Sequence, residues 1–174
     1  MGTKWKKAEL GVVLLLFVVS ILAWLPGCAR VQKTVGSATN VLKGTQTDQQ
    51  LESRENAVRR YKYKSTRNEL FLEVPVVSPK IVKPGETLNQ TVQFGLLSPR
   101  VEKTFYVIEV ITLTGGDLVV ELLKKDSEKN QGIHATTLQF TIPKDLPQGR
   151  YTVVTNILAD NIKARKTVSF RVKR

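Results

Sequence analysis

From Glu69 to the C-terminus, hydrophobic and polar residues alternate along short runs. In the last run, Val168, Phe170 and Val172 fall on one face, and polar residues fall on the other. Proline, glycine, asparagine and aspartate separate the runs, and this spacing is typical of an antiparallel sandwich or barrel. The pattern predicts an all-β fold with strands at Leu70–Val77, Thr87–Leu96, Thr104–Leu113, Leu118–Leu123, Ile133–Ile142, Arg150–Leu158 and Lys166–Lys173.

The third of these runs is hydrophobic on both faces. From Phe105 to Ile111 its only charged residue is Glu109. A strand of this kind is either central and covered on its second face, or it exposes a hydrophobic face for recognition. We favour cover by the helix or tether that precedes the strands.

The first 27 residues have a different pattern. Lys4, Lys6 and Lys7 precede a run without charge from Leu10 to Leu25. A basic start followed by a short apolar run is the layout of an export signal. A membrane anchor is the alternative, although the run is shorter than the roughly 20 residues of a spanning helix.

The end of this run carries a motif. Leu25-Pro26-Gly27-Cys28 resembles the lipobox of bacterial lipoproteins, in which a small residue precedes an obligatory cysteine. The resemblance implies that the leader 1–27 is removed, that the thiol of Cys28 receives a diacylglycerol, and that the protein is anchored in a membrane. Ala29 and Arg30 follow the cysteine, and by the family's sorting rule they favour the outer membrane, facing the periplasm. The inner membrane is the alternative.

Residues 28–68 have the character of a tether. Hydrophobic residues recur at helical spacing at its start, but glycines and threonines weaken the helix. Thr47-Asp48-Gln49-Gln50 matches a capping box, which predicts a short helix from Asp48 to Tyr61. The segment is therefore predicted to be a partly helical tether.

Charge is concentrated in the tether. The chain has 174 residues and a net charge of +12, and residues 30–68 hold nine basic against three acidic residues. Near a bilayer such residues attract anionic headgroups or polymers, and a solvated surface is the alternative interpretation. Basic residues interleaved with tyrosines also suit nucleic acid, but an exported lipoprotein rarely meets it. The candidate contact residues are Arg59, Arg60, Lys62, Lys64 and Arg67.

Chemistry typical of an enzyme is missing from the sequence. The single cysteine excludes an internal disulfide, and with one histidine, His134, it excludes a zinc site built from these two residue types. Gly115-Gly116-Asp117 is typical of a hairpin turn rather than a phosphate-binding loop. Glu109 has no second catalytic group near it in sequence. We therefore expect no enzyme activity, no metal or other cofactor, and no small-molecule substrate.

Two turns resemble those of bacterial immunoglobulin-like domains. Lys83-Pro84-Gly85-Glu86-Thr87-Leu88 resembles the turn into their second strand, and the stretch 142–153, with Leu146-Pro147 before Gly149 and Tyr151, resembles the corner into their sixth. The resemblance implies that residues 69–174 form an antiparallel immunoglobulin-like sandwich of about seven strands. It also implies that the Tyr151 ring packs inward while its hydroxyl binds nearby backbone.

Together these features predict a lipid-anchored envelope protein with a non-catalytic binding or assembly module. Its expected partners are the membrane, through Cys28, and an envelope protein complex of which it is an accessory subunit. Two alternatives remain open at this point. One is a periplasmic chaperone or inhibitor that caps client strands, and the other is a module that binds cell wall or lipopolysaccharide through charge.

Overall fold

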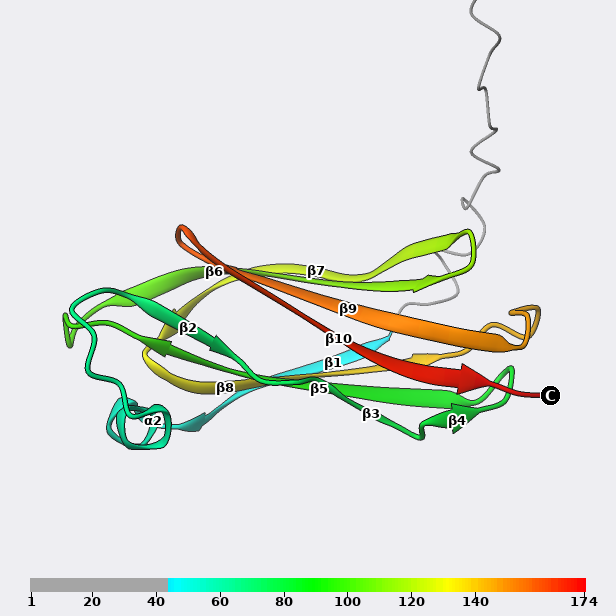
Figure 1. Cartoon of the computed structure of the whole chain (residues 1–174), viewed down its shortest axis with the longest axis horizontal. Helices are drawn as coiled ribbons and strands as arrows, with labels where there is room; N and C mark the ends of the chain where they lie inside the picture. The colour runs from blue at the N-terminus through cyan, green and yellow to red at the C-terminus, as the bar shows by residue number, and fades with distance from the viewer. Residues whose placement is uncertain (1–43) are drawn as a thin grey trace, which may run out of the picture. The chain divides into compact units, whose positions relative to one another are not determined.

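A computed structural model describes residues 44–174, which fold into a β-sandwich (Figure 1). The first sheet, called sheet A, has the strand order β1-β8-β5-β2, and β3 also pairs with β5. Its strands are β1 (Thr45–Glu52), β2 (Glu69–Leu72), β3 (Val76–Ser78), β5 (Thr87–Leu97) and β8 (Gly132–Thr141).

The second sheet, called sheet B, has the order β4-β10-β9-β6-β7. All strand pairs in the two sheets are antiparallel except β4 with β10, which is parallel. The strands of sheet B are β4 (Ile81–Val82), β6 (Thr104–Gly115), β7 (Leu118–Asn130), β9 (Gly149–Ala159) and β10 (Ile162–Val172). The predicted all-β sandwich is therefore confirmed.

The leader and Cys28 lie outside the described residues. The one helix within residues 44–174 is α2 (Arg54–Tyr61), and no helix there is long and apolar enough to cross a membrane.

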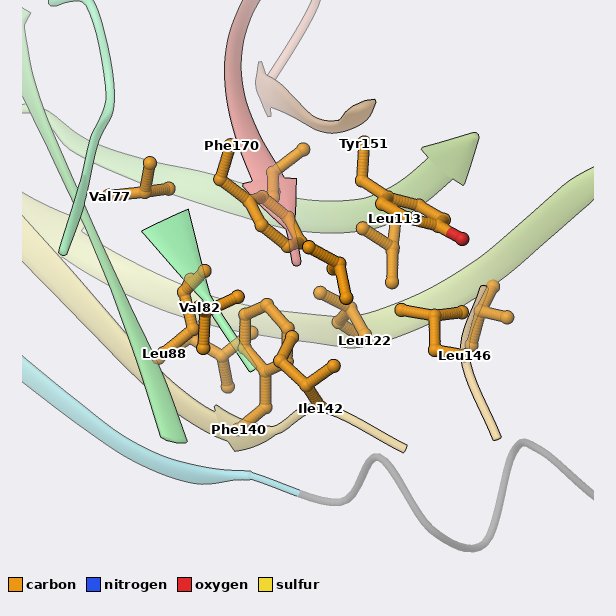
Figure 2. Close-up of a cluster of buried hydrophobic side chains, with 14 of the residues drawn as sticks. Val77, Val82, Leu88, Leu113, Leu122, Phe140, Ile142, Leu146, Tyr151 and Phe170 are labelled. Carbon is orange, nitrogen blue, oxygen red and sulfur yellow. The ribbon is translucent and has the colours of Figure 1, made fainter. Parts of the chain in front are cut away.

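The core lies between the sheets, where every second residue of the central strands faces inward. One cluster gathers around Leu113, Phe140 and Phe170 (Figure 2), and a smaller one gathers around Phe94 and Phe105. Burying such side chains is worth about 1.5–3 kcal/mol each before the cost of ordering them. The alternation read from the sequence thus corresponds to the two faces of real strands.

The corner before β9 has the predicted geometry. The Tyr151 ring packs against the Phe170 ring, with the two centroids 5.9 Å apart (Figure 2). The Tyr151 hydroxyl donates a hydrogen bond to the backbone oxygen of Pro147 over 2.8 Å. The ring also presses against Gly115, where a Cβ would lie 2.3 Å from it. Only glycine leaves room for this contact, so the β6–β7 hairpin and the corner are fitted to each other.

Three of the predicted runs differ clearly from the observed strands. The run predicted to begin at Lys166 begins at Ile162 in β10. The run Leu70–Val77 is divided into β2 and β3. The run Leu118–Leu123 continues to Asn130, and the predicted break from Asp126 to Gly132 is wrong. The strand continues because Lys125, Ser127 and Lys129 keep the alternation and point inward, toward β1.

The predicted helix from Asp48 to Tyr61 is wrong in its first half. Residues Thr45–Glu52 form β1, which pairs antiparallel with β8, and the helix begins only at Arg54. The Asp48 carboxylate binds lysines of β7 instead of capping a helix. The sandwich therefore includes part of the segment 28–68 that the sequence assigns to the tether.

The helix covers sheet A rather than the third predicted strand. Ala57 is fully buried against Leu97 and Ile133, and the Tyr61 ring lies over Gly95, where a Cβ would be 2.3 Å away. Cover of β6 by the helix is therefore wrong, since β6 belongs to sheet B. The outer face of β6 stays partly open, and Ile108, Val110 and residues of β9 line a hollow of about 280 Å³ there.

Candidate functional site

The predicted basic contact residues lie at the end of the sandwich that carries the helix. Arg59 and Arg60 are on α2, and Lys62 ends the helix in a left-handed conformation with φ 51°. Lys64 and Arg67 follow in the exposed connection to β2. The five residues are thus neighbours in space as well as in sequence, but Arg60 is already neutralised. Its guanidinium pairs with Glu52 and Glu73, each over 2.8 Å.

The tyrosines interleaved with these cations belong to the fold. The Tyr61 ring stacks on Phe71 with centroids 4.4 Å apart, and its hydroxyl donates to Glu73 over 2.8 Å. Burial, followed by the Glu73 contact, raises the pKa of Tyr61. Tyr63 donates to the backbone oxygen of Arg67 over 2.7 Å. The Tyr61 face is therefore occupied and offers no platform for a nucleic-acid base.

On one side of the sandwich, the two sheets end in β1 and β7. Nothing in residues 44–174 pairs with the outer edge of either strand. The two edges differ in chemistry, because β7 carries six charged residues whereas β1, TQTDQQLE, carries two, Asp48 and Glu52, and has no lysine, arginine, proline or glycine. Lysine, proline and bulges are the usual means of blocking an edge. The edge of β1 is regular from Thr45 to Gln50, and it is the less protected of the two.

Beneath β1, polar side chains of the two edge strands face each other. We call this set the polar seam, and it consists of Gln46, Asp48 and Gln50 from β1 with Lys125, Ser127 and Lys129 from β7. Asp48 accepts hydrogen bonds from Lys125 over 2.7 Å and from Lys129. Burial acts to raise the pKa of Asp48, but the two lysine hydrogen bonds outweigh it and hold that pKa below its ordinary value. The seam therefore ties β1 to sheet B by charge.

Behind the seam lies the buried carboxylate of Glu109. It is 1% exposed, accepts a hydrogen bond from Thr136 over 2.7 Å, and lies 3.6 Å from the ammonium group of Lys129. Its second oxygen has no hydrogen-bond partner within residues 44–174. His134 stacks on Phe94, and burial lowers its pKa. Among the described residues no group of three acidic, histidine or cysteine side chains is placed to hold a metal ion.

A further polar contact joins the sheets where β7 passes into β8. The side-chain oxygen of Gln131 accepts hydrogen bonds from the backbone N–H of Ser98 over 2.7 Å and from the Arg54 guanidinium over 3.1 Å. The side-chain nitrogen of Gln131 donates to the backbone oxygens of Arg100 and Val101 over 2.7 and 2.8 Å. One buried side chain thus connects the start of the helix, the β5–β6 loop and the crossing between sheets.

Sequence reasoning missed β1, the polar seam and Gln131. Asp48 and its lysine partners are far apart along the chain, so no local pattern joins them. The continued alternation of Lys125, Ser127 and Lys129 was the available signal, but it resembles a solvated turn. A single buried glutamine leaves no pattern at all.

β1 contributes nothing to the hydrophobic clusters formed by residues 44–174. It is held by backbone pairing with β8 and by the ion pairs of the seam, and most of its residues are exposed. The candidate functional site is therefore the outer edge of β1, supported from below by the polar seam.

Comparisons with known proteins identify neither a family nor a function for this chain. No known family profile and no curated protein matches the sequence. Among solved structures, similar folds occur in a Pseudomonas fluorescens alkylpurine DNA glycosylase (14% identity, TM-score 0.46, 61% of this chain and 31% of that one) and a Bacillus subtilis sporulation control protein (15%, 0.45, 60% and 49%). Another is the CARDB domain of a Pyrococcus furiosus protein (12%, 0.48, 64% and 95%). The chain spans half or less of the first two, and these likenesses carry no function over to it.

Proposed function

We propose that this protein is a lipid-anchored envelope protein whose sandwich is a non-catalytic binding and assembly module. The lipobox ending at Cys28 supports the anchor, and the outer membrane facing the periplasm is the proposed location. The module serves as an accessory subunit of a larger envelope complex.

The observation that carries the binding role is the unblocked edge of β1. A partner segment in extended conformation can add to such an edge through main-chain hydrogen bonds, which make few demands on side chains. The competing edges suit this less well, since β7 is highly charged and the edge strands β2, β3 and β4 have only four, three and two residues. β1 is thus the strand on which a partner chain adds to sheet A.

The anchor limits how far this edge can lie from the bilayer. Between Cys28 and Thr45 the chain can extend at most about 3.3–3.6 Å per residue, which gives a reach of roughly 60 Å. A partner that meets β1 is therefore itself at the membrane surface or projects into the periplasm close to it.

Adding lysines to the exposed face of β1 should abolish partner binding. In Thr47→Lys/Gln49→Lys, two charges stand on the solvent side of the edge strand and oppose the approach of another strand, as lysine does on natural edges. Crosslinking and affinity purification from native membranes should then recover the variant without the proteins that accompany the wild type. The melting temperature should change little, because both side chains are outside the core.

The matched control places the same charge on the other edge. Val119 is 63% exposed and Asn130 is exposed, so Val119→Lys/Asn130→Lys adds two lysines to β7. It should keep the partner. If the β7 variant loses the partner and the β1 variant keeps it, the partner does not bind at the edge of β1. If the wild-type protein is recovered from membranes without any other protein, the assembly role is contradicted.

A further inference from the structure

A group of cations that form no ion pair within residues 44–174 lies at the end of the sandwich where β1 begins. Gly44 is already against β8, since a Cβ there would lie 2.0 Å from the backbone oxygen of Gln139. The pairing registers bring the end of β8, the start of β9 and the end of β10 to this same end. In Figure 1 the C-terminus lies here, and α2 lies at the opposite end.

At this end a shallow, open hollow of about 450 Å³ is lined by four basic residues. These residues are Arg150 at the start of β9 and Arg171, Lys173 and Arg174 at the end of the chain. Gln148 also lines the hollow. The backbone that carries Arg171 and Lys173 is held by hydrogen bonds. Their backbone N–H groups donate to the backbone oxygens of Lys80 and Val82 in the neighbouring segment. The cations therefore project from a fixed base.

Arg150 and Arg171 are direct cross-strand partners. Like charges directly opposite each other destabilise a sheet, and an anion bound between the two guanidinium groups would offset their repulsion. The ion pairs formed within residues 44–174 use Arg60, Lys103, Lys125 and Lys129, and none of the cations around the hollow is among them. The hollow thus combines crowded positive charge with space for a ligand that neutralises it.

We infer that this hollow binds the phosphate group of an anionic lipid headgroup. Two guanidinium groups suit a phosphate because each presents paired N–H donors to its oxygens. The bilayer is the source because the chain that leads from Cys28 enters the sandwich at this end, a step that rests on the proposed lipid anchor. The phosphate chemistry of the hollow does not depend on that anchor.

The hollow at Arg150 and the Arg59–Arg67 group are two separate basic surfaces of the protein. β1 runs from this end toward the helix, and its eight residues span roughly 26 Å at 3.3 Å per residue. The Arg59–Arg67 group lies beyond its far end, and Arg60 within it is neutralised by Glu52 and Glu73. The hollow at Arg150 is therefore the surface that meets the bilayer.

Inorganic phosphate tests the site itself. In the detergent-purified membrane form, phosphate should raise the melting temperature relative to sodium chloride of equal ionic strength. Arg150→Gln/Arg171→Gln should lose this rise, while Lys64→Gln/Arg67→Gln, which removes the same charge from the far end, should keep it. The first variant should melt no lower than wild type in chloride, because it also removes a repulsive pair. A wild type that does not respond to phosphate, or an equal response in all three proteins, overturns the site.

Vesicles test the source. A polarity-sensitive fluorophore attached in a Gln148→Cys variant should shift its emission to the blue in phosphatidylcholine vesicles that contain phosphatidylglycerol, but not in phosphatidylcholine alone. When Arg150→Gln/Arg171→Gln is added to this variant, the emission shift should require a roughly 30-fold higher concentration of phosphatidylglycerol. This factor corresponds to about 1 kcal/mol for each of the two basic residues removed from the membrane surface. A phosphate response without the emission shift overturns the bilayer as the source. An unmodified Cys28 in the same preparation contradicts the anchor, whereas the phosphate measurement still reports on the site.

Discussion

Replacing Lys129 with methionine should lower the free energy of unfolding by about 3–5 kcal/mol, the usual result of removing one partner of a buried ion pair. The Lys129 side chain is 5% exposed and lies between the carboxylates of Glu109 and Asp48. Methionine is similar in length, so the change removes charge with little loss of volume. Glu109 then remains buried, with Thr136 as its one hydrogen-bond donor among residues 44–174. Urea unfolding followed by circular dichroism measures the loss.

Lys125 provides the matched control for this prediction. It binds the same Asp48 oxygen, but its side chain is 30% exposed. Lys125→Met should therefore cost about 1 kcal/mol or less, as for other exposed pairs. Adding Glu109→Gln to Lys129→Met should recover part of the stability, since it removes the unpaired charge. Equal losses at Lys125 and Lys129, or no recovery, would show that the buried pair does not support the fold as described.

Replacing Gln131 with alanine should cost about 1–3 kcal/mol, because the buried N–H of Ser98 loses its acceptor while the partly buried oxygens of Arg100 and Val101 lose their donor. The side chain is 5% exposed and satisfies the Ser98 N–H as well as the oxygens of Arg100 and Val101. The same urea titration measures the loss. The start of the helix should also loosen, since Arg54 binds the same amide, and amide hydrogen exchange at the first turn of α2 should increase.

Gln139 is the control for the second prediction, because it is exposed on β8. Gln139→Ala should change stability by about 0.5 kcal/mol or less, as is usual for surface positions. If Gln131→Ala behaves in the same way, solvent must replace the lost contacts, and the role of Gln131 in joining the two sheets is then wrong.

Most strands of the core could be predicted because a hydrophobic inner face alternates with a polar outer one, and β6 could be predicted because a strand that is hydrophobic on both faces is typical of a central position. The corner at Tyr151 could be predicted because its residues form a contiguous motif with one conformation. The end of the helix at Tyr61 was also correct, since Ala57, Val58 and Tyr61 form a local stripe that packs on sheet A.

β1 and the second half of β7 could not be predicted for the opposite reason. Their inward residues are polar or charged, so they resemble a capped helix and a solvated turn when read alone. The role of Asp48 depends on its ion pairs with Lys125 and Lys129, which lie far from it in sequence and reach it only in the folded protein. The hollow at Arg150 has the same origin, because Arg150 and Arg171 meet only through the pairing of β9 with β10.

Mass spectrometry of the protein purified from native membranes tests the lipid anchor on which the proposed function depends. The account predicts a first peptide that begins at Cys28 and carries the mass of a diacylglycerol on the thiol, with residues 1–27 removed. A chain that keeps its leader and has an unmodified Cys28 thiol would contradict it, and the protein would then be attached to the membrane by its apolar leader instead.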